Sequence, residues 1–143
     1  MAISTSPFIK TLFGFSGGIQ ASKAWETGKP LMDRLWDTIR ANKLATTGIN
    51  YWFYQPKGKL FVGVELNQVP PGSLDLERNE LRFEKYASWK HKGRFSEIPT
   101  GYRVLQEEIM KSEQTETGRS LEIYGHVKPG DPDSEMEVLI EVR

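Results

Sequence analysis

Leu60-Phe61-Val62-Gly63-Val64-Glu65-Leu66 is the stretch that decides the fold, because it recurs as Met136-Glu137-Val138-Leu139-Ile140-Glu141-Val142. The two stretches share an apolar residue at every second position and their second-to-last Glu, at a constant offset of 76 residues (136 − 60 = 76). Upstream, Pro30 matches Pro99 at an offset of 69 residues (99 − 30 = 69). Solenoid repeats are only about 20–50 residues long and need about three copies. The repeat therefore predicts a single domain, residues 1–143, with pseudo-twofold symmetry.

Composition excludes several classes of protein. With 143 residues, of which 38% are hydrophobic, the chain can fill one core, and equal numbers of basic and acidic residues, 19 each, argue against nucleic-acid binding. No signal peptide and no run near the ~18 apolar residues of a membrane span is present. Cysteine is absent, and His91 and His126 fit no metal-binding motif. We therefore expect a cytoplasmic protein without metal, cofactor, or direct contact with nucleic acid or membrane.

The first copy, about residues 7–68, reads as strand, helix, strand and strand. Leu31, Leu35 and Ile39 recur every four residues, which is typical of one face of a helix, and Pro30 suits a first helical turn because its missing N–H is not needed there. Alternating and aromatic stretches indicate the strands. The predicted elements are a strand at 8–15, a loop to about Lys29, a helix from Pro30 to about Asn42, and strands at 49–54 and 60–66.

The second copy, about residues 80–143, follows a linker at about 69–79. The linker begins at Val69-Pro70-Pro71-Gly72-Ser73, because proline supplies no hydrogen-bond donor to a sheet. The predicted elements are a strand at 81–90, a helix at 97–111, a polar loop at 114–120, and strands at 121–127 and 136–142. Together the two copies predict an α+β domain with two helices against a largely antiparallel sheet.

The second copy also carries a family likeness. Tyr86 to Pro99, then Tyr102, Leu121 to Gly125, and Glu135 to Val138 resemble the GyrI-like small-molecule-binding family, which includes effector-binding domains of bacterial multidrug-responsive transcription activators. The likeness is strong from Leu81 onward and mostly topological over residues 1–70. It implies a curved sheet with a ligand cleft between two modules. The first strand begins within about ten residues of Met1, so we expect a stand-alone member without a DNA-binding region.

Glu122 is the acidic residue that the resemblance places in the ligand cleft. A carboxylate kept from water beside flat rings attracts a lipophilic cation. Burial also raises a Glu pKa toward the range useful for proton transfer, so a catalytic role is an alternative. The third alternative is a solvated carboxylate that contacts a lysine. Tyr124 lies two residues on, on the same strand face, where its hydroxyl would bind a ligand or the carboxylate, or simply be half-buried.

The first copy has aromatic residues where the second has its acid. In Tyr51-Trp52-Phe53-Tyr54, either Tyr51 and Phe53 or Trp52 and Tyr54 face the cleft, and a one-residue error in register exchanges the pairs. We take Trp52 and Tyr54 as candidates for the ligand-binding wall.

Other aromatic residues are weighed between wall and core. Trp36 and Tyr102 lie on the two predicted helices, so each is a wall candidate with packing as the alternative. Trp89 is a further wall candidate, but it and Tyr86 fall on opposite faces of their strand, so at most one of them lines the cleft. Trp25 falls in a predicted loop, where it acts as a lid or folds back onto the sheet. Glu137 and Glu141 share one face of the last strand and are expected to form its wet edge rather than a catalytic pair.

Three functions follow from the residues and the resemblance. The first is a binding protein that senses or sequesters a hydrophobic, planar or cationic small molecule, with Glu122 as counter-ion. The second is a hydrolase, because some stand-alone relatives open strained cyclopropane-bearing toxins; Glu122, helped by Tyr124, would then position or deprotonate the attacking water. The third is a protein-binding regulator, since the family takes its name from a gyrase-inhibitory member.

Overall fold

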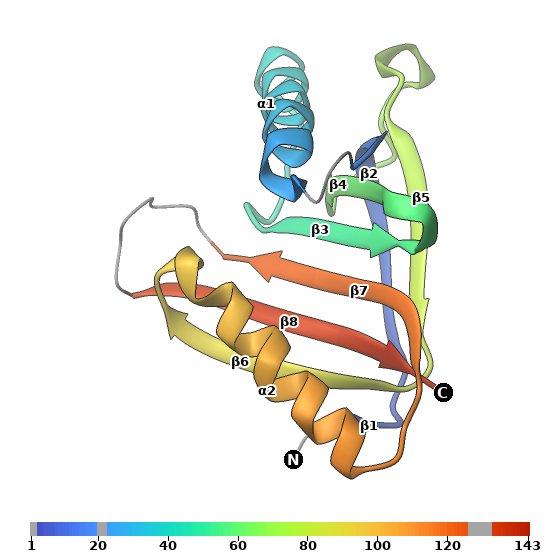
Figure 1. The fold of residues 1–143 in the computed structure, drawn as a ribbon. Coiled ribbons are helices and arrows are strands. Elements are labelled where there is room, and N and C mark those ends of the chain that lie inside the picture. The colour runs from blue at the N-terminus through green and yellow to red at the C-terminus, as the bar shows by residue number, and fades with distance from the viewer. Residues whose placement is uncertain (1–2, 20–22, 126–132) are drawn as a thin grey trace.

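The computed structural model describes residues 3–19, 23–125 and 133–143. The helices are α1 (Ala24–Ala41) and α2 (Ile98–Lys111). The strands are β1 (Ile3–Ser4), β2 (Phe8–Gly18), β3 (Asn50–Gln55), β4 (Lys59–Val64), β5 (Glu77–Phe83), β6 (Tyr86–Gly93), β7 (Glu116–Tyr124) and β8 (Ser134–Val142). They form one curved antiparallel sheet in the order β1-β6-β8-β7-β3-β4-β2-β5 (Figure 1). This confirms the predicted α+β class.

The two halves of the sheet meet at β3 and β7, which lie side by side between the two helices (Figure 1). Trp52 pairs with Val62 on one side and with Glu122 on the other, and Glu122 pairs in turn with Val138. The pairs are related by offsets of 70 (122 − 52 = 70) and 76 (138 − 62 = 76). Trp52 and Glu122 therefore hold equivalent positions, and the predicted pseudo-twofold axis passes between them.

Both helices cover the same face of the sheet. α1 buries Leu35 and Ile39 in a cluster that contains Val62, the cross-strand partner of Trp52. α2 buries Leu105 and Ile109 in a second cluster, which contains the cross-strand partner of Glu122. Residues directly opposite in a sheet share a face, so the two helices flank the central pair and leave a cleft above it.

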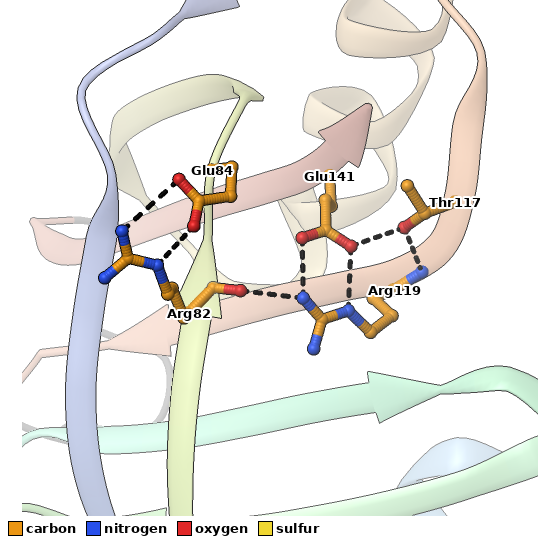
Figure 2. Close-up of polar contacts among 5 residues, drawn as sticks. All are labelled: Arg82, Glu84, Thr117, Arg119 and Glu141. Carbon is orange, nitrogen blue, oxygen red and sulfur yellow. Dashed lines mark hydrogen bonds and ion pairs between the residues drawn. The ribbon is translucent and has the colours of Figure 1, made fainter. Parts of the chain in front are cut away.

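The opposite face curls into a half-barrel with its own apolar interior, formed by the side chains of Leu12, Tyr51, Phe53, Phe61, Leu81, Phe83, Leu121 and Leu139. Arg119 of β7 links β8 and β5 (Figure 2). Its Nε and Nη2 donate to Oε1 and Oε2 of Glu141 at 2.7 and 2.6 Å, and Nη2 also donates to the carbonyl of Arg82 at 2.7 Å. The guanidinium lies 5.1 Å from the ring centroid of Phe83.

Glu141 corrects a sequence-based expectation. It is only 8% exposed, whereas the alternating pattern of the last strand predicted a wet carboxylate. The hydroxyl of Thr117 donates to its Oε1 at 2.7 Å beside Arg119, while Arg82 pairs outward with Glu84 (Figure 2). Curvature is the reason for the difference, because it brings β5 across this face and an alternating pattern carries no information about that packing.

Several element boundaries also differ from the predicted ones. α1 begins at Ala24, so Pro30 lies inside the helix and the predicted loop ends earlier. The predicted strand at 81–90 is two strands, β5 and β6, separated at Glu84 and Lys85. β5 starts within the predicted linker and pairs with β2 of the first half, and its exposed charged side chains make it read as a loop.

The predicted polar loop at 114–120 already contains the start of β7, because the polar and partly exposed residues at that end of the strand carry no apolar alternation. The predicted end of that strand at 127 lies outside the described residues. α2 agrees with the predicted helix at 97–111 to within one residue. Neither α1 nor α2, the two helices described, is long and apolar enough to cross a membrane.

Candidate functional site

Three tyrosine hydroxyls surround the carboxylate of Glu122. Tyr124 and Tyr54 donate to Oε1 at 2.6 and 3.1 Å, and Tyr102 donates to Oε2 at 2.7 Å. Glu122 is 6% exposed. The tyrosines come from β7, β3 and α2, so elements from both halves of the chain meet at a single carboxylate.

The register of β3 and β7 produces this arrangement. Trp52 lies directly opposite Glu122, and Tyr54 lies opposite Ser120, while Tyr124 lies opposite Asn50. Residues two apart share a face, so the two tyrosines flank the carboxylate diagonally. Of the two alternatives left open by the sequence, Trp52 and Tyr54 share the face of Glu122, and Tyr51 and Phe53 point into the half-barrel.

The pKa of the Glu122 carboxyl group is determined mainly by its burial. Burial raises the pKa of Glu122 above its ordinary value, although the hydrogen bonds from Tyr124, Tyr102 and Tyr54 act in the opposite direction. Burial, together with the nearby carboxylate, also raises the pKa values of the three tyrosines, which therefore remain protonated donors. Within residues 3–19, 23–125 and 133–143, no basic side chain forms an ion pair with Glu122. The alternative of a solvated Glu122 beside a lysine is therefore wrong.

A cavity of about 280 Å³ lies next to this cluster, above the centre of the sheet. It is lined by Trp25, Met32, Trp52, Phe95, Ser96 and Tyr124. The rings of Trp25 and Trp52 stack with centroids 5.7 Å apart and an interplanar angle of 14°. Tyr124 contacts Trp52 and Phe95 edge to face at 5.9 and 4.9 Å. Tyr124 therefore joins the two parts of the site: its ring lines the cavity and its hydroxyl binds Glu122.

Two predicted wall residues lie elsewhere. Trp36, a residue of α1, donates from Nε1 to Oδ1 of Asn50 at 2.6 Å and packs against the apolar cluster that α1 covers. Trp89 packs beneath α2 at Gly101 and stacks on His91, with ring centroids 4.7 Å apart. Neither residue lines the cavity, and both pack against the core instead.

Four lining residues were not among the predicted wall. The sequence predicts Trp25 to be a loop residue, and the structure places it in the first turn of α1. Phe95 belongs to a stretch that resembles the family, but nothing in the sequence gives it a role, and Met32 and Ser96 have no signal of their own. The repeat carries the missing information, because Trp25 and Phe95 are related by the offset of 70 that relates Trp52 to Glu122 (95 − 25 = 70).

A larger cavity, about 470 Å³, lies on the other face of the sheet. Its lining residues are Ile49, Lys90, His91, Lys92, Ile123, Gly125, Glu135, Met136 and Glu137. Lys92 and Glu135 form an ion pair at 3.7 Å, and Lys90 lowers the pKa of Glu137 against the larger, raising effect of burial. Lysines thus accompany the acidic side chains here, whereas no basic side chain among the described residues pairs with Glu122, where we place the candidate site.

The structure offers no candidate metal site among the residues it describes, since no three His, Asp or Glu side chains there are placed to hold an ion. His126 lies outside the described residues. His91 has a structural contact instead, with Nε2 lying 3.1 Å from Oε1 of Glu97.

Comparisons with known proteins extend this picture to the fold. No protein-family model matches the chain, and no curated protein matches its sequence. The C-terminal domain of EcmrR is similar in structure, with a TM-score of 0.71 and 12% identity over 100% of this chain and 99% of that one. The fold is shared. SAV2435 bound to tetraphenylphosphonium has a TM-score of 0.69 and 13% identity, covering 100% and 94% of the two chains.

A hydrolase from Listeria innocua is also similar, with a TM-score of 0.56 and 11% identity over 99% of this chain and 94% of that chain. At such low identities these likenesses establish the fold alone. They are consistent with the GyrI-like fold that the sequence predicted.

Proposed function

We propose that this is a cytoplasmic protein that binds a hydrophobic, flat or cationic small molecule in the cleft and so senses or sequesters it. The observation that carries the proposal is the buried carboxylate of Glu122, which accepts hydrogen bonds from tyrosine hydroxyls beside an aromatic cavity and forms no ion pair with a basic side chain among the described residues. An ionised group in such surroundings is costly unless a charge compensates it. A bound cation would supply that charge.

The rings give the second half of the recognition. Trp25, Trp52 and Phe95 offer faces and edges to a flat or lipophilic cation, with attraction between cation and ring adding to apolar burial. Glu122 does not line the cavity itself, and its charge acts on the ligand from behind Tyr124. The similarity in fold to SAV2435, whose structure holds tetraphenylphosphonium, supports a ligand of this class.

Intrinsic tryptophan fluorescence tests the proposal. Wild type and Glu122→Gln are titrated with tetraphenylphosphonium and with neutral triphenylphosphine oxide. We expect the substitution to weaken binding of the cation roughly tenfold and to leave the neutral compound within about twofold. Glu137→Gln is the matched control, because it removes a half-buried carboxylate from the other face and should change neither affinity. Equal weakening of both ligands by Glu122→Gln would contradict the counter-ion role.

Hydrolysis is the second candidate function, supported by the similar fold of a hydrolase and by a carboxyl group whose pKa burial raises. Glu122 would accept a proton from water as the water oxygen bonds to carbon of a strained cyclopropane; the ring C–C bond breaks and its electron pair takes up a proton. Incubation with an electrophilic cyclopropane, followed by mass spectrometry, tests this. A hydrated product that Glu122→Gln abolishes would favour it, and unchanged substrate after long incubation would reject it.

A further inference from the structure

The two ends of the cleft are held with unequal strength. Phe95 belongs to a short 3₁₀ turn, Phe95–Glu97, at the start of α2. The carboxylate of Glu97 accepts the backbone N–H of Arg94 through Oε2 and contacts His91 of β6 through Oε1. A side-chain cap of this kind satisfies backbone donors that a helix start otherwise leaves open. The wall carrying Phe95 is therefore fixed to the sheet.

Among the described residues, no comparable side-chain attachment holds the wall that carries Trp25. Lys23, at the N-terminal cap of α1, makes no side-chain capping hydrogen bond. Its ion pair with Glu26, at 3.6 Å, is exposed at both partners, and such pairs add little. Trp25 is 62% exposed. The contacts that hold Trp25 and Gly28 to the centre of the sheet are the stacking of Trp25 on Trp52 and the close approach of Gly28 to the same ring.

The sequence weakens α1 at the same place. Pro30 lies inside the helix and cannot donate the hydrogen bond that the carbonyl of Glu26 would otherwise accept. Gly28 lies two residues earlier, and glycine and proline are the residues least favourable to a helix interior. In α2 the corresponding proline, Pro99, is in the first turn, where no donor is missed. Across this joint Lys29 pairs with Asp33 at 2.6 Å, but both side chains are exposed and such a pair adds little. The segment Ala24–Lys29 is thus joined to the rest of α1 where its backbone is least favourable to a helix.

The small volume of the cavity points to a function for the segment Ala24–Lys29. Ligand pockets are usually about 300–1,000 Å³, and the cavity here is about 280 Å³. A ligand larger than the resting cavity requires one wall to move, and only the wall at Trp25 is free to do so among the lining residues at the two helix starts. Resting on the binding function proposed above, we infer that Trp25 determines ligand specificity, and that Ala24–Lys29 swings outward to admit flat aromatic ligands and stacks Trp25 upon them.

Hydrogen exchange tests the movement without any ligand. The informative amides are those of Gly28 and Lys29, whose helical acceptors are the carbonyls of Ala24 and Trp25, with Tyr102 and Arg103 of α2 as internal controls. We expect faster exchange at Gly28 and Lys29 than at the controls. Pro30→Ala restores a donor and should slow exchange at Gly28 and Lys29 roughly tenfold while leaving α2 unchanged. Equal protection of the two helix starts in wild type would overturn the inference.

Two cations test the specificity. Trp25→Ala should weaken binding of flat, aromatic ethidium roughly tenfold and of ring-free tetrabutylammonium less than about twofold. Met110→Ala is the matched control, because it removes an exposed apolar side chain from α2. Equal losses for both cations, or no loss for either, would overturn the role of Trp25. If neither cation binds wild type, the proposed function fails, and the exchange measurement still decides whether Ala24–Lys29 opens.

Discussion

Trp52 and Glu122 face each other across β3 and β7, and each occupies the position that the other holds in its own half of the chain. The repeat thus brings its two most different residues together at its own axis. One half supplies an aromatic ring and the other a charge. The strand pair β3 and β7 therefore supplies both the aromatic ring and the charge of the candidate site.

Replacing Glu122 should stabilise the fold at neutral and alkaline pH. Because burial raises its pKa in the folded state, its contribution is fully present below the ordinary Glu pKa and is lost as pH rises through the folded value. Glu122→Gln carries no such penalty. Thermal unfolding should show a higher midpoint for the variant at about pH 8, with a gap that closes by about pH 4. A variant less stable than wild type at about pH 8 would contradict this linkage.

The tyrosine hydroxyls should tune the affinity for cations. Tyr124→Phe removes a 2.6 Å hydrogen bond that favours the ionised carboxylate, so the pKa of Glu122 should rise further and cation binding should fail at a higher pH than in wild type. We expect roughly threefold to tenfold weaker binding of tetraphenylphosphonium at neutral pH, measured by calorimetry. Tyr54→Phe, which removes a longer bond of 3.1 Å, serves as the graded comparison and should cost less.

Gly28 and Gly101 form a matched pair for separating stability from binding. A Cβ on either glycine would lie 2.3 Å from a tryptophan ring, that of Trp52 beneath α1 or that of Trp89 beneath α2. Substitution of either by Ala should lower the free energy of unfolding by about 1–3 kcal/mol, measured by urea denaturation. Only Gly28→Ala displaces a cavity ring, so only that variant should alter ligand affinity. A comparable effect of Gly101→Ala on binding would show that the two sites are coupled.

The ion pair of Arg119 and Glu141 should make the half-barrel sensitive to acid. Burial would raise the pKa of Glu141, but Arg119 and Thr117 outweigh it and the net pKa is lowered. Its stabilisation is therefore present above the ordinary Glu pKa and lost as pH falls through the folded value. Arg119→Ala should cost about 1–3 kcal/mol in urea denaturation, a value kept modest because Arg119 is partly exposed.

A double variant separates the charge of the Arg119–Glu141 pair from the packing of these two side chains. Arg119→Met with Glu141→Leu should recover much of the loss and remove the acid sensitivity, since apolar pairs often replace buried ion pairs without penalty. If the double variant unfolds as readily as Arg119→Ala at neutral pH, the stacking of Arg119 over Phe83 matters more than its charge.

Alternation and periodicity were enough to predict the helices and the central strands, because burial of one face dictates the pattern locally. They failed where packing between distant segments decides. Glu141 reads as wet because its cover, β5, comes from elsewhere in the chain. Pro30 reads as a helix start because the segment before it contains Gly28, whose role is to admit the ring of Trp52.

The candidate site shows the same division. Glu122, Tyr124, Tyr54 and Tyr102 were all predicted to line the cleft, and the structure places them in one hydrogen-bonded group. The convergence of the three hydroxyls on the carboxylate could not be predicted. It depends on the register of β3 and β7, which turns and loops of differing length determine. Trp36 and Trp89 carry the same aromatic signal as Trp52, and only the position of each ring relative to the helices separates wall from core.

The position of Glu122 beside the axis bears on how such a site can arise. In a dimer of two identical modules, an acid at this position would face its own copy directly across the strand pair, and two carboxylates so placed repel each other. Covalent fusion of the modules removes that constraint, because each half then mutates on its own. A lone charge at a twofold centre is thus possible in a single chain with two unlike halves and impossible in a symmetric dimer of identical modules.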